Sequence, residues 1–297
     1  MLSNALADYH PLVRLCYFVP VLLFAMLIQQ PVILLIMFSS ALASALYFGR
    51  KKALKLFLLG VVPSALFVCL LNPLFNHAGI TILCYLPDGN PFTLESVIYG
   101  GAAGCLFAGV LLWCVYLRCT VRTDGILYLF GRIAPQFSLL LSMIFRFLPQ
   151  FAEQFRQVRA AQYSLGRDIT QGSLFRRLKN AVRILSAVIG LSMENAVNTA
   201  DALKSRGCGL PHRTSFSLYH FERRDGIVLA VTVLCSGVIA AAFFMEQLDF
   251  YYFPIMTDLS FEVQMLPVYA AFVVLYGLPL FLQGKEAYTW NVLRSKI

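Results

Sequence analysis

The sequence predicts an all-α integral membrane protein with about six transmembrane helices and, between the fourth and fifth of them, cytoplasmic amphipathic helices. Hydrophobic residues make up 59% of the 297 positions, and the mean hydropathy is +0.72. Only 13% of the residues are charged, against about 25% in soluble domains. These figures exclude a secreted disulfide scaffold, a disordered chain and a cytosolic enzyme, and the length favours one membrane domain.

Six apolar runs are long enough, or nearly long enough, to cross a bilayer. The first two are short and can pack as a hairpin. The runs lie at about Leu15–Ile28, Pro31–Phe48, Leu56–Leu74, Ser96–Leu117, Gly226–Met245 and Leu266–Gln283. We therefore divide the chain into N-terminal membrane helices (1–125), a cytoplasmic or interfacial region (126–225) and C-terminal membrane helices (226–297).

The distribution of charge orients these helices. The net charge is +9, and residues 146–225 hold 13 Lys/Arg against 6 Asp/Glu. Residues 76–95 and 246–262 contain no Lys or Arg. Because basic loops stay on the cytoplasmic side, both termini and residues 118–225 are expected inside. The mature protein is expected to start near Met1, since no cleavable signal is convincing.

The apolar stretch Ile126–Met143 does not fit a simple crossing. One crossing there would carry the basic region outside, and the stretch is too short to cross twice. We expect helices that lie along the inner face or dip into it, interrupted near Gly131 and Pro135.

None of the six runs contains an ionisable side chain of Asp, Glu, Lys, Arg or His. Ion-coupled carriers and proton relays need such groups inside the membrane, so this chain lacks the means to drive transport by itself. Gly100 and Gly104 offer a small-residue face, which suits packing against the chain's own helices or against a partner. The eight cysteines form no CxxC pair, and we expect no metal site, no disulfide framework and no cofactor.

Two amphipathic helices are predicted in the basic region. The first has Pro149 in its first turn and stops at Gly166. The second begins within Ile184–Ile189 and ends at Arg206-Gly207, where Gly207 supplies a left-handed residue. Apolar residues form one stripe along the second helix, at Ile189, Met193, Ala196, Val197, Ala200 and Leu203.

An arginine beside a helix-ending glycine has two interpretations. It is ordinary stop chemistry when seen alone. On the cytoplasmic face of a membrane protein without its own energy source, it can also enter a groove of another subunit and bind carboxylates or carbonyls. The second interpretation predicts a mechanical connection to a cytosolic motor.

The run from Ser192 to Thr214, SMENAVNTADALKSRGCGLPHRT, closely resembles the second signature of the T component of energy-coupling factor (ECF) transporters. These are vitamin and metal-ion importers related to ABC transporters. Further matches are Asn72–His77, Asn90–Glu95, Thr123-Asp124, Arg146–Pro149 and Ala161–Gly166. The resemblance runs from about Asn72 to Thr214.

The resemblance implies a non-catalytic scaffold in a bacterial or archaeal cell membrane. Such a scaffold holds two cytosolic ATPase subunits, which hydrolyse the ATP, and a small substrate-binding membrane subunit. In the family, two Ala-Arg-Gly-like helix ends each enter one ATPase. The second maps onto Ser205, Arg206 and Gly207. The first maps onto Ser164, Leu165 and Gly166, so Leu165 replaces the expected arginine, and either Arg167 substitutes for it or the contact is apolar.

Two other functions are weighed against this one. A membrane-embedded enzyme acting on lipids or prenyl chains would need a catalytic motif, and no HExxH, GxSxG, DDxxD-type or GxxxxGK[ST] motif occurs. Clustered Lys and Arg also attract anionic lipid headgroups and nucleic acid. We expect lipid contact as a secondary role and no nucleic-acid partner.

Overall fold

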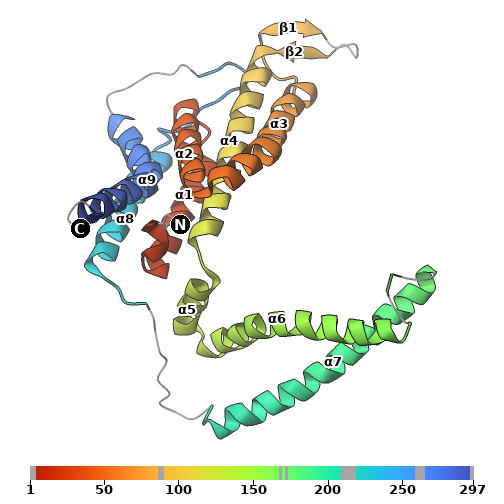
Figure 1. Ribbon diagram of the computed structural model, residues 1–297. Helices are drawn as coiled ribbons and strands as arrows, with labels where there is room; N and C mark the ends of the chain where they lie inside the picture. The colour runs from red at the N-terminus through yellow and green to blue at the C-terminus, as the bar shows by residue number, and fades with distance from the viewer. Residues whose placement is uncertain are drawn as a thin grey trace. The chain divides into compact units, whose positions relative to one another are not determined.

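The computed structural model describes residues 5–85, 90–166, 169–170, 173–208, 219–257 and 265–294. Nearly all of the described regular structure is helical (Figure 1). The elements are η1 (Ala5–Asp8), α1 (Pro11–Leu27), α2 (Pro31–Leu56), the π-helical turn η2 (Phe57–Val61), α3 (Val62–Phe75), β1 (Ile82–Tyr85), β2 (Pro91–Thr93), α4 (Leu94–Thr120), α5 (Thr123–Ile133), α6 (Pro135–Ser164), α7 (Leu174–Ser205), α8 (Arg223–Phe244) and α9 (Leu266–Arg294).

The chain forms two compact units. One consists of Met1–Ile126 together with Tyr219–Ile297, and we call it the membrane unit. The other consists of Leu127–Leu218, and we call it the inserted unit because it interrupts the first in sequence.

The membrane unit confirms the predicted fold class. Four of its helical stretches are long and apolar enough to span a bilayer, namely 57–75, α4, α8 and α9, and α1 and the first part of α2 are shorter apolar helices. Each of the six apolar runs therefore became a helix. Helices α2 and α9 extend past the predicted run ends to Leu56 and Arg294, because Lys and Arg favour helix as strongly as most apolar residues do.

A turn of π-helix separates α2 from α3. Pro63 stands in the first turn of α3. Proline has no N–H to donate to the preceding turn, so the regular hydrogen-bond pattern cannot pass through this point. The break therefore falls at the start of the third apolar run, after the basic residues Arg50, Lys51, Lys52 and Lys55 that end the second.

Aromatic residues form the centre of the membrane unit. Trp113 of α4 is fully buried, and the rings of Tyr17, Phe18, Tyr116 and Tyr276 lie with their centroids 5.7–6.5 Å from its own. The Tyr17 hydroxyl donates a 2.9 Å hydrogen bond to the Leu275 carbonyl. These contacts join α1, α4 and α9.

The two glycines of the small-residue face bring α3 and α4 together, side by side in Figure 1. A Cβ atom at Gly100 would lie 2.7 Å from the Cys69 carbonyl oxygen, and one at Gly104 would lie 2.9 Å from that of Ala65. This face therefore packs against the chain's own helix, which is the first of the two alternatives that the sequence left open.

A small antiparallel sheet of β1 and β2 precedes α4, and the sequence analysis did not foresee it. The Glu95 carboxylate, in the first turn of α4, accepts hydrogen bonds from the Thr81 hydroxyl at 2.7 Å and the Thr81 N–H at 3.1 Å. Thr93 donates to the Ala78 carbonyl at 3.0 Å. Polar contacts, and not an alternating apolar pattern, hold these strands in place. A hydropathy pattern therefore could not reveal them.

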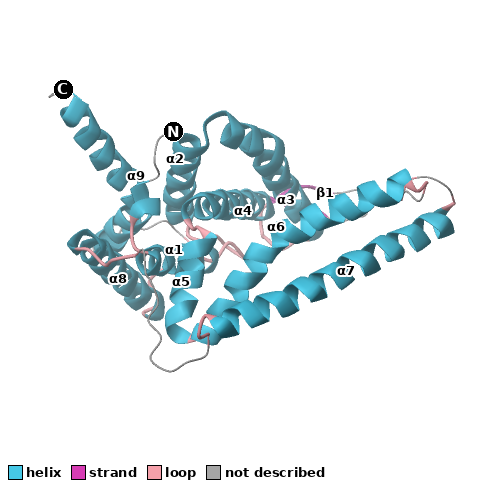
Figure 2. Ribbon diagram, turned by 60° about the horizontal axis from the view of Figure 1, so that its bottom comes forward, coloured by secondary structure: helices cyan, strands magenta, loops and turns pink. Residues whose placement is uncertain are grey.

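The inserted unit contains most of α5 and the long helices α6 and α7, which lie alongside each other (Figure 2). The interruption predicted near Pro135 is confirmed, since Ala134 separates α5 from α6, whereas the one predicted near Gly131 was wrong, because Gly131 lies inside α5. The prediction of Pro149 in a first turn was wrong, since α6 begins at Pro135 and Pro149 lies inside it. The second helix begins at Leu174 and not within Ile184–Ile189, so Arg176, Arg177, Lys179 and Arg183 are helical.

Candidate functional site

The first candidate site is the end of α6. Ser164 is the last helical residue, Leu165 is the C-cap and Gly166 has φ +69°. The Gly166 N–H donates to the Tyr163 carbonyl at 2.9 Å, which satisfies one of the carbonyls that every helix end leaves unpaired. The predicted stop at Gly166 is confirmed, and Leu165 is 65% exposed at this end. Arg167 lies outside the described residues.

The second candidate site is the end of α7, which is closed in the same way. Arg206 is the C-cap and Gly207 has φ +73°. The Gly207 N–H donates to the Lys204 carbonyl and the Cys208 N–H to the Leu203 carbonyl, both at 3.0 Å. This pair of hydrogen bonds is a Schellman motif. The predicted helix end at Arg206-Gly207 is confirmed, and Ser205 and Arg206 are exposed there.

The two helices pack through both polar and apolar residues. The Ser192 hydroxyl donates to Gln154 Oε1 at 3.2 Å and to the Val188 carbonyl at 2.6 Å. A pocket between α6 and α7 is lined by Phe147, Gln150, Phe151, Gln154, Ser192, Asn195 and Ala196. Residues of the second signature, including Ser192 and Asn195, therefore contact α6 as well as leading to the Arg206 end.

Several residues of the predicted apolar stripe of α7 face outward within the inserted unit. Ile189, Met193 and Val197 are at least 50% exposed, whereas Asn180, Ile184 and Val188 are buried. Helix α6 has an exposed apolar stripe of its own, at Phe137, Leu140, Ile144 and Leu148. Amphipathicity marked both helices correctly, but the side of α7 that contacts α6 could not be read from it.

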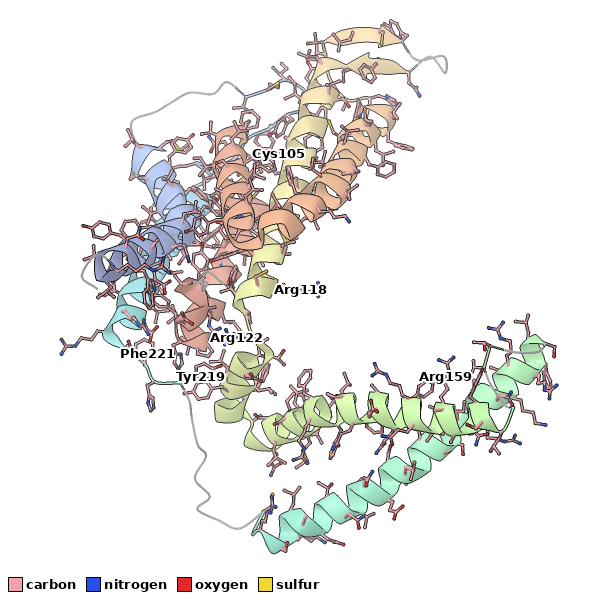
Figure 3. The ribbon with its side chains drawn as sticks, viewed as in Figure 1. Cys105, Arg118, Arg122, Arg159, Tyr219 and Phe221 are labelled. Atoms are coloured by element: carbon pink, nitrogen blue, oxygen red, sulfur yellow. The ribbon has the colours of Figure 1, made fainter. Side chains whose placement is uncertain are left out.

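A third feature, absent from the sequence analysis, lies in the membrane unit where the chain leaves it and returns to it. Arg14 of α1 is only 2% exposed. Its Nη1 donates to the Thr120 carbonyl at 3.0 Å, and its Cζ lies 5.9 Å from the centroid of the Tyr219 ring. Thr120 ends α4, and Tyr219 is the first residue after the inserted unit (Figure 3). One arginine thus contacts both connections.

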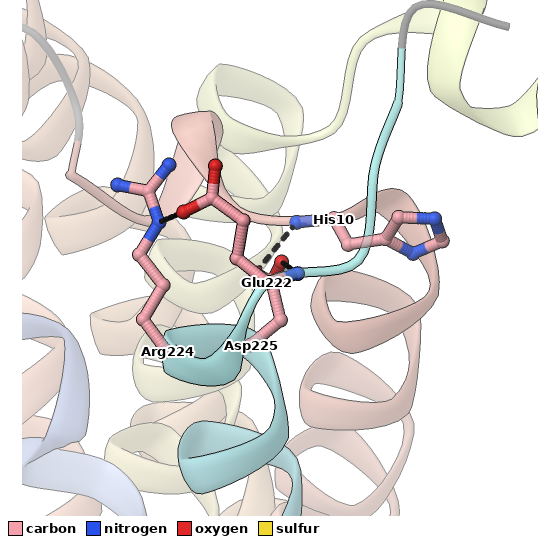
Figure 4. A network of polar contacts seen from close by, with 4 residues as sticks. All are labelled: His10, Glu222, Arg224 and Asp225. Atoms are coloured by element: carbon pink, nitrogen blue, oxygen red, sulfur yellow. Dashed lines mark hydrogen bonds and ion pairs between the residues drawn. The ribbon is translucent and has the colours of Figure 1, made fainter.

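Asp225 joins the start of α8 to the residue that precedes α1 (Figure 4). Its carboxylate is 2% exposed and accepts from the N–H of His10 at 3.0 Å and from that of Glu222 at 2.9 Å. The second of these bonds belongs to a capping box that starts α8. Arg224 is paired with Glu222 at 2.8 Å and lies over the Tyr9 ring. Burial raises the pKa of Tyr9, and the charge of Arg224 opposes this shift.

The family model of the cobalt transport proteins, CbiQ, matches residues 3–216. The chain belongs to this family. The match covers both candidate helix ends and the whole inserted unit except its last two residues, and it confirms the resemblance to ECF T components stated above.

Several relatives of this chain bear the name energy-coupling factor transporter transmembrane protein EcfT. That of Bacillus selenitireducens is 33% identical over 111 residues, which are 37% of this chain and 41% of the relative. EcfT 1 of Listeria monocytogenes is 28% identical over 200 residues, 62% of this chain and 74% of the relative. EcfT of Brevibacillus brevis is 32% identical over 124 residues, 39% of this chain and 47% of the relative. The matches thus span less than half the length of two of these relatives.

Proposed function

We propose that this chain is the transmembrane T component of an ECF-type importer for a vitamin or a metal ion. In this role it links two cytosolic ATPases to a small substrate-binding membrane subunit and does not hydrolyse ATP itself. The observation that carries the proposal is the Schellman-capped end of α7, which exposes Arg206 within the signature of the family. The names of the relatives support the transport role.

The two helix ends are the proposed contacts with the ATPases. Arg206 can form a forked hydrogen-bonded pair with a carboxylate or with carbonyls in a groove. The end of α6 presents Leu165 in the corresponding place. The first contact is therefore apolar or uses Arg167, as the sequence left open.

The exposed stripe of α6 is the proposed surface for the substrate-binding subunit. Its side chains Phe137, Leu140, Ile144 and Leu148 are 45–62% exposed. Arg146 is the one charged residue between Pro135 and Ala152. An apolar surface with so little charge suits a membrane protein as its partner. Both termini and residues 126–225 are cytoplasmic in this proposal, because the positive charge is concentrated there.

The test is purification of the tagged chain from its host in mild detergent, with and without Arg206→Glu. The wild type should bring down two ATP-binding-cassette subunits and a small membrane protein. Loss of a charged anchor whose partner stays buried costs about 2–5 kcal/mol, so the variant should bind the ATPases at least roughly thirtyfold more weakly. Its matched control is Arg156→Glu, an exposed charge change about two turns before the end of α6.

Normal ATPase binding and uptake in the Arg206→Glu variant would contradict the coupling role of this helix end. If the wild type is purified without any ATPase or small membrane protein, the scaffold itself is refuted. A membrane-embedded lipid- or prenyl-processing enzyme would then be the alternative.

A further inference from the structure

We infer that the N-terminal half of α7 is a binding site for anionic phospholipids of the inner leaflet. It has an exposed apolar stripe consisting of Leu174, Leu178, Val182, Leu185 and Ile189, whose exposed fractions run from 82% to 50%. We call this set the α7 stripe. At about 1.5 Å per residue it is roughly 22 Å long. The inference stands independently of the ATPase contacts.

The stripe and the contact with α6 occupy different sides of the helix. At about 100° per residue, the α7 stripe covers an arc of roughly 80°. The buried residues Asn180, Ile184 and Val188 cover a second arc whose centre is about 120° or more away. The apolar stripe is therefore available while α7 stays packed against α6.

Basic residues occupy the exposed polar face of α7 between the stripe and the α6 contact. Arg176, Lys179 and Arg183 are exposed and lie about 60–120° past the Val182 edge of the stripe, on the arc that separates this edge from the α6 contact. Arg177 is placed differently, since its Nε donates to the Ile169 carbonyl at 2.7 Å and braces the start of the helix. Residues 169–193 contain no Asp or Glu. This part of α7 is thus apolar along one line, and the only charges on its polar face are positive.

This combination fits a lipid surface with negative headgroups. Helices that lie in a bilayer interface bury an apolar face by a few ångström and keep Lys and Arg at headgroup level. The α6 stripe, with Arg146 as its one neighbouring charge, lacks such a cationic polar face. Because the chain is already anchored in the membrane by its other unit, even weak binding to the leaflet suffices to hold α7 there.

The experiment is hydrogen exchange on the full chain in nanodiscs. One set contains phosphatidylcholine alone, and the other contains phosphatidylcholine with about one third phosphatidylglycerol. Each cation near an anionic surface strengthens binding by about fivefold. Amides 174–189 should therefore exchange at least about fivefold more slowly in the anionic discs, and added salt near 0.5 M should remove most of the difference.

Variants distinguish an effect of the basic side chains of α7 from a loss of helix structure. Combined Arg176→Gln, Lys179→Gln and Arg183→Gln should abolish the lipid dependence. The matched control combines Arg146→Gln, Arg156→Gln and Arg159→Gln, three exposed arginines of α6, and should retain it. Leu178→Asp should give fast exchange in both lipids. Each variant is first checked for helix content by circular dichroism.

Equal exchange in the two lipids would overturn the inference, as would equal loss in the two triple variants. Slow exchange that appears only when a purified ATPase or substrate-binding subunit is added would also overturn it, because the stripe would then be a protein contact. Arg206→Glu should leave the lipid effect intact, so failure here is distinguishable from failure of the proposed function.

Discussion

Arg14→Met tests whether one buried arginine fastens both connections between the two units. The substitution keeps a flexible, unbranched stem of similar volume but without the guanidinium, so it leaves little cavity. It removes the hydrogen bond to the Thr120 carbonyl and the charge beside the Tyr219 ring. Both contacts lie on a residue that is 2% exposed.

The expected cost follows from those two contacts. A hydrogen bond from a charged donor contributes about 1.5–3 kcal/mol. A desolvated cation–π contact contributes up to about 2 kcal/mol. Part of this is offset, because the Arg14 Nε is buried and has no hydrogen-bond partner among the described residues. We expect a net loss of about 2–4 kcal/mol.

The assay is thermal unfolding of the purified chain in detergent, followed by circular dichroism. Arg118→Met is the matched control, since Arg118 is exposed in the last turn of α4, and it should change stability by no more than about 0.5 kcal/mol. The midpoint of the Arg14→Met chain should fall by about 4 °C or more. Hydrogen exchange should also accelerate at residues 120–125 and 219–223. If both variants unfold at the same temperature with unchanged exchange, the fastening role is refuted.

Two further predictions concern the membrane unit. Gly100→Ala should destabilise the chain by about 1–3 kcal/mol, because its Cβ would lie 2.7 Å from the Cys69 carbonyl oxygen. Gly101→Ala is the control, since its Cβ meets open space, and it should be neutral or slightly stabilising. Equal unfolding midpoints for the two variants would disprove close packing of α3 on α4. Asp225→Ala leaves two backbone N–H groups without their acceptor and should cost about 2–4 kcal/mol, whereas Arg224→Ala removes a half-exposed ion pair and should cost at most about 1 kcal/mol. Chemical unfolding would compare the latter two, and the same loss in both would show that the Asp225 hydrogen bonds contribute little.

The parts of the fold that the sequence predicted are those set by composition and by single residues. Long apolar runs produced the membrane helices, and Gly166 and Gly207 ended α6 and α7 with positive φ. The start of α7 was predicted about ten residues too late. Its first turns carry Arg176, Arg177 and Lys179, and these charges hid an apolar i, i+4 spacing that already begins with Leu174 and Leu178.

The features that the sequence did not reveal depend on residues far apart in the chain. Arg14 contacts residues 106 and 205 positions away, and each partner looks like ordinary loop or helix-end chemistry when read alone. The exposure of the α7 stripe is similar, because the sequence shows an apolar face but not which side α6 covers. Local patterns specify elements, whereas these contacts depend on the assembled fold.

Long-range hydrogen bonds in the membrane unit also determine how late in translation its folding can be completed. The Ala5 N–H donates to Gln283, the His10 N–H to Asp225 and the Tyr17 hydroxyl to the Leu275 carbonyl, across 278, 215 and 258 positions. At about 5–20 residues per second, a ribosome needs roughly 14–56 s to make the 278 residues that separate the first pair. Helix α1 must therefore wait near the membrane through almost the whole of translation before its partners exist. A chain released before α9 still contains Asp225 but lacks Gln283 and Leu275, so the Ala5 N–H and the Tyr17 hydroxyl have no native acceptor in an incomplete copy.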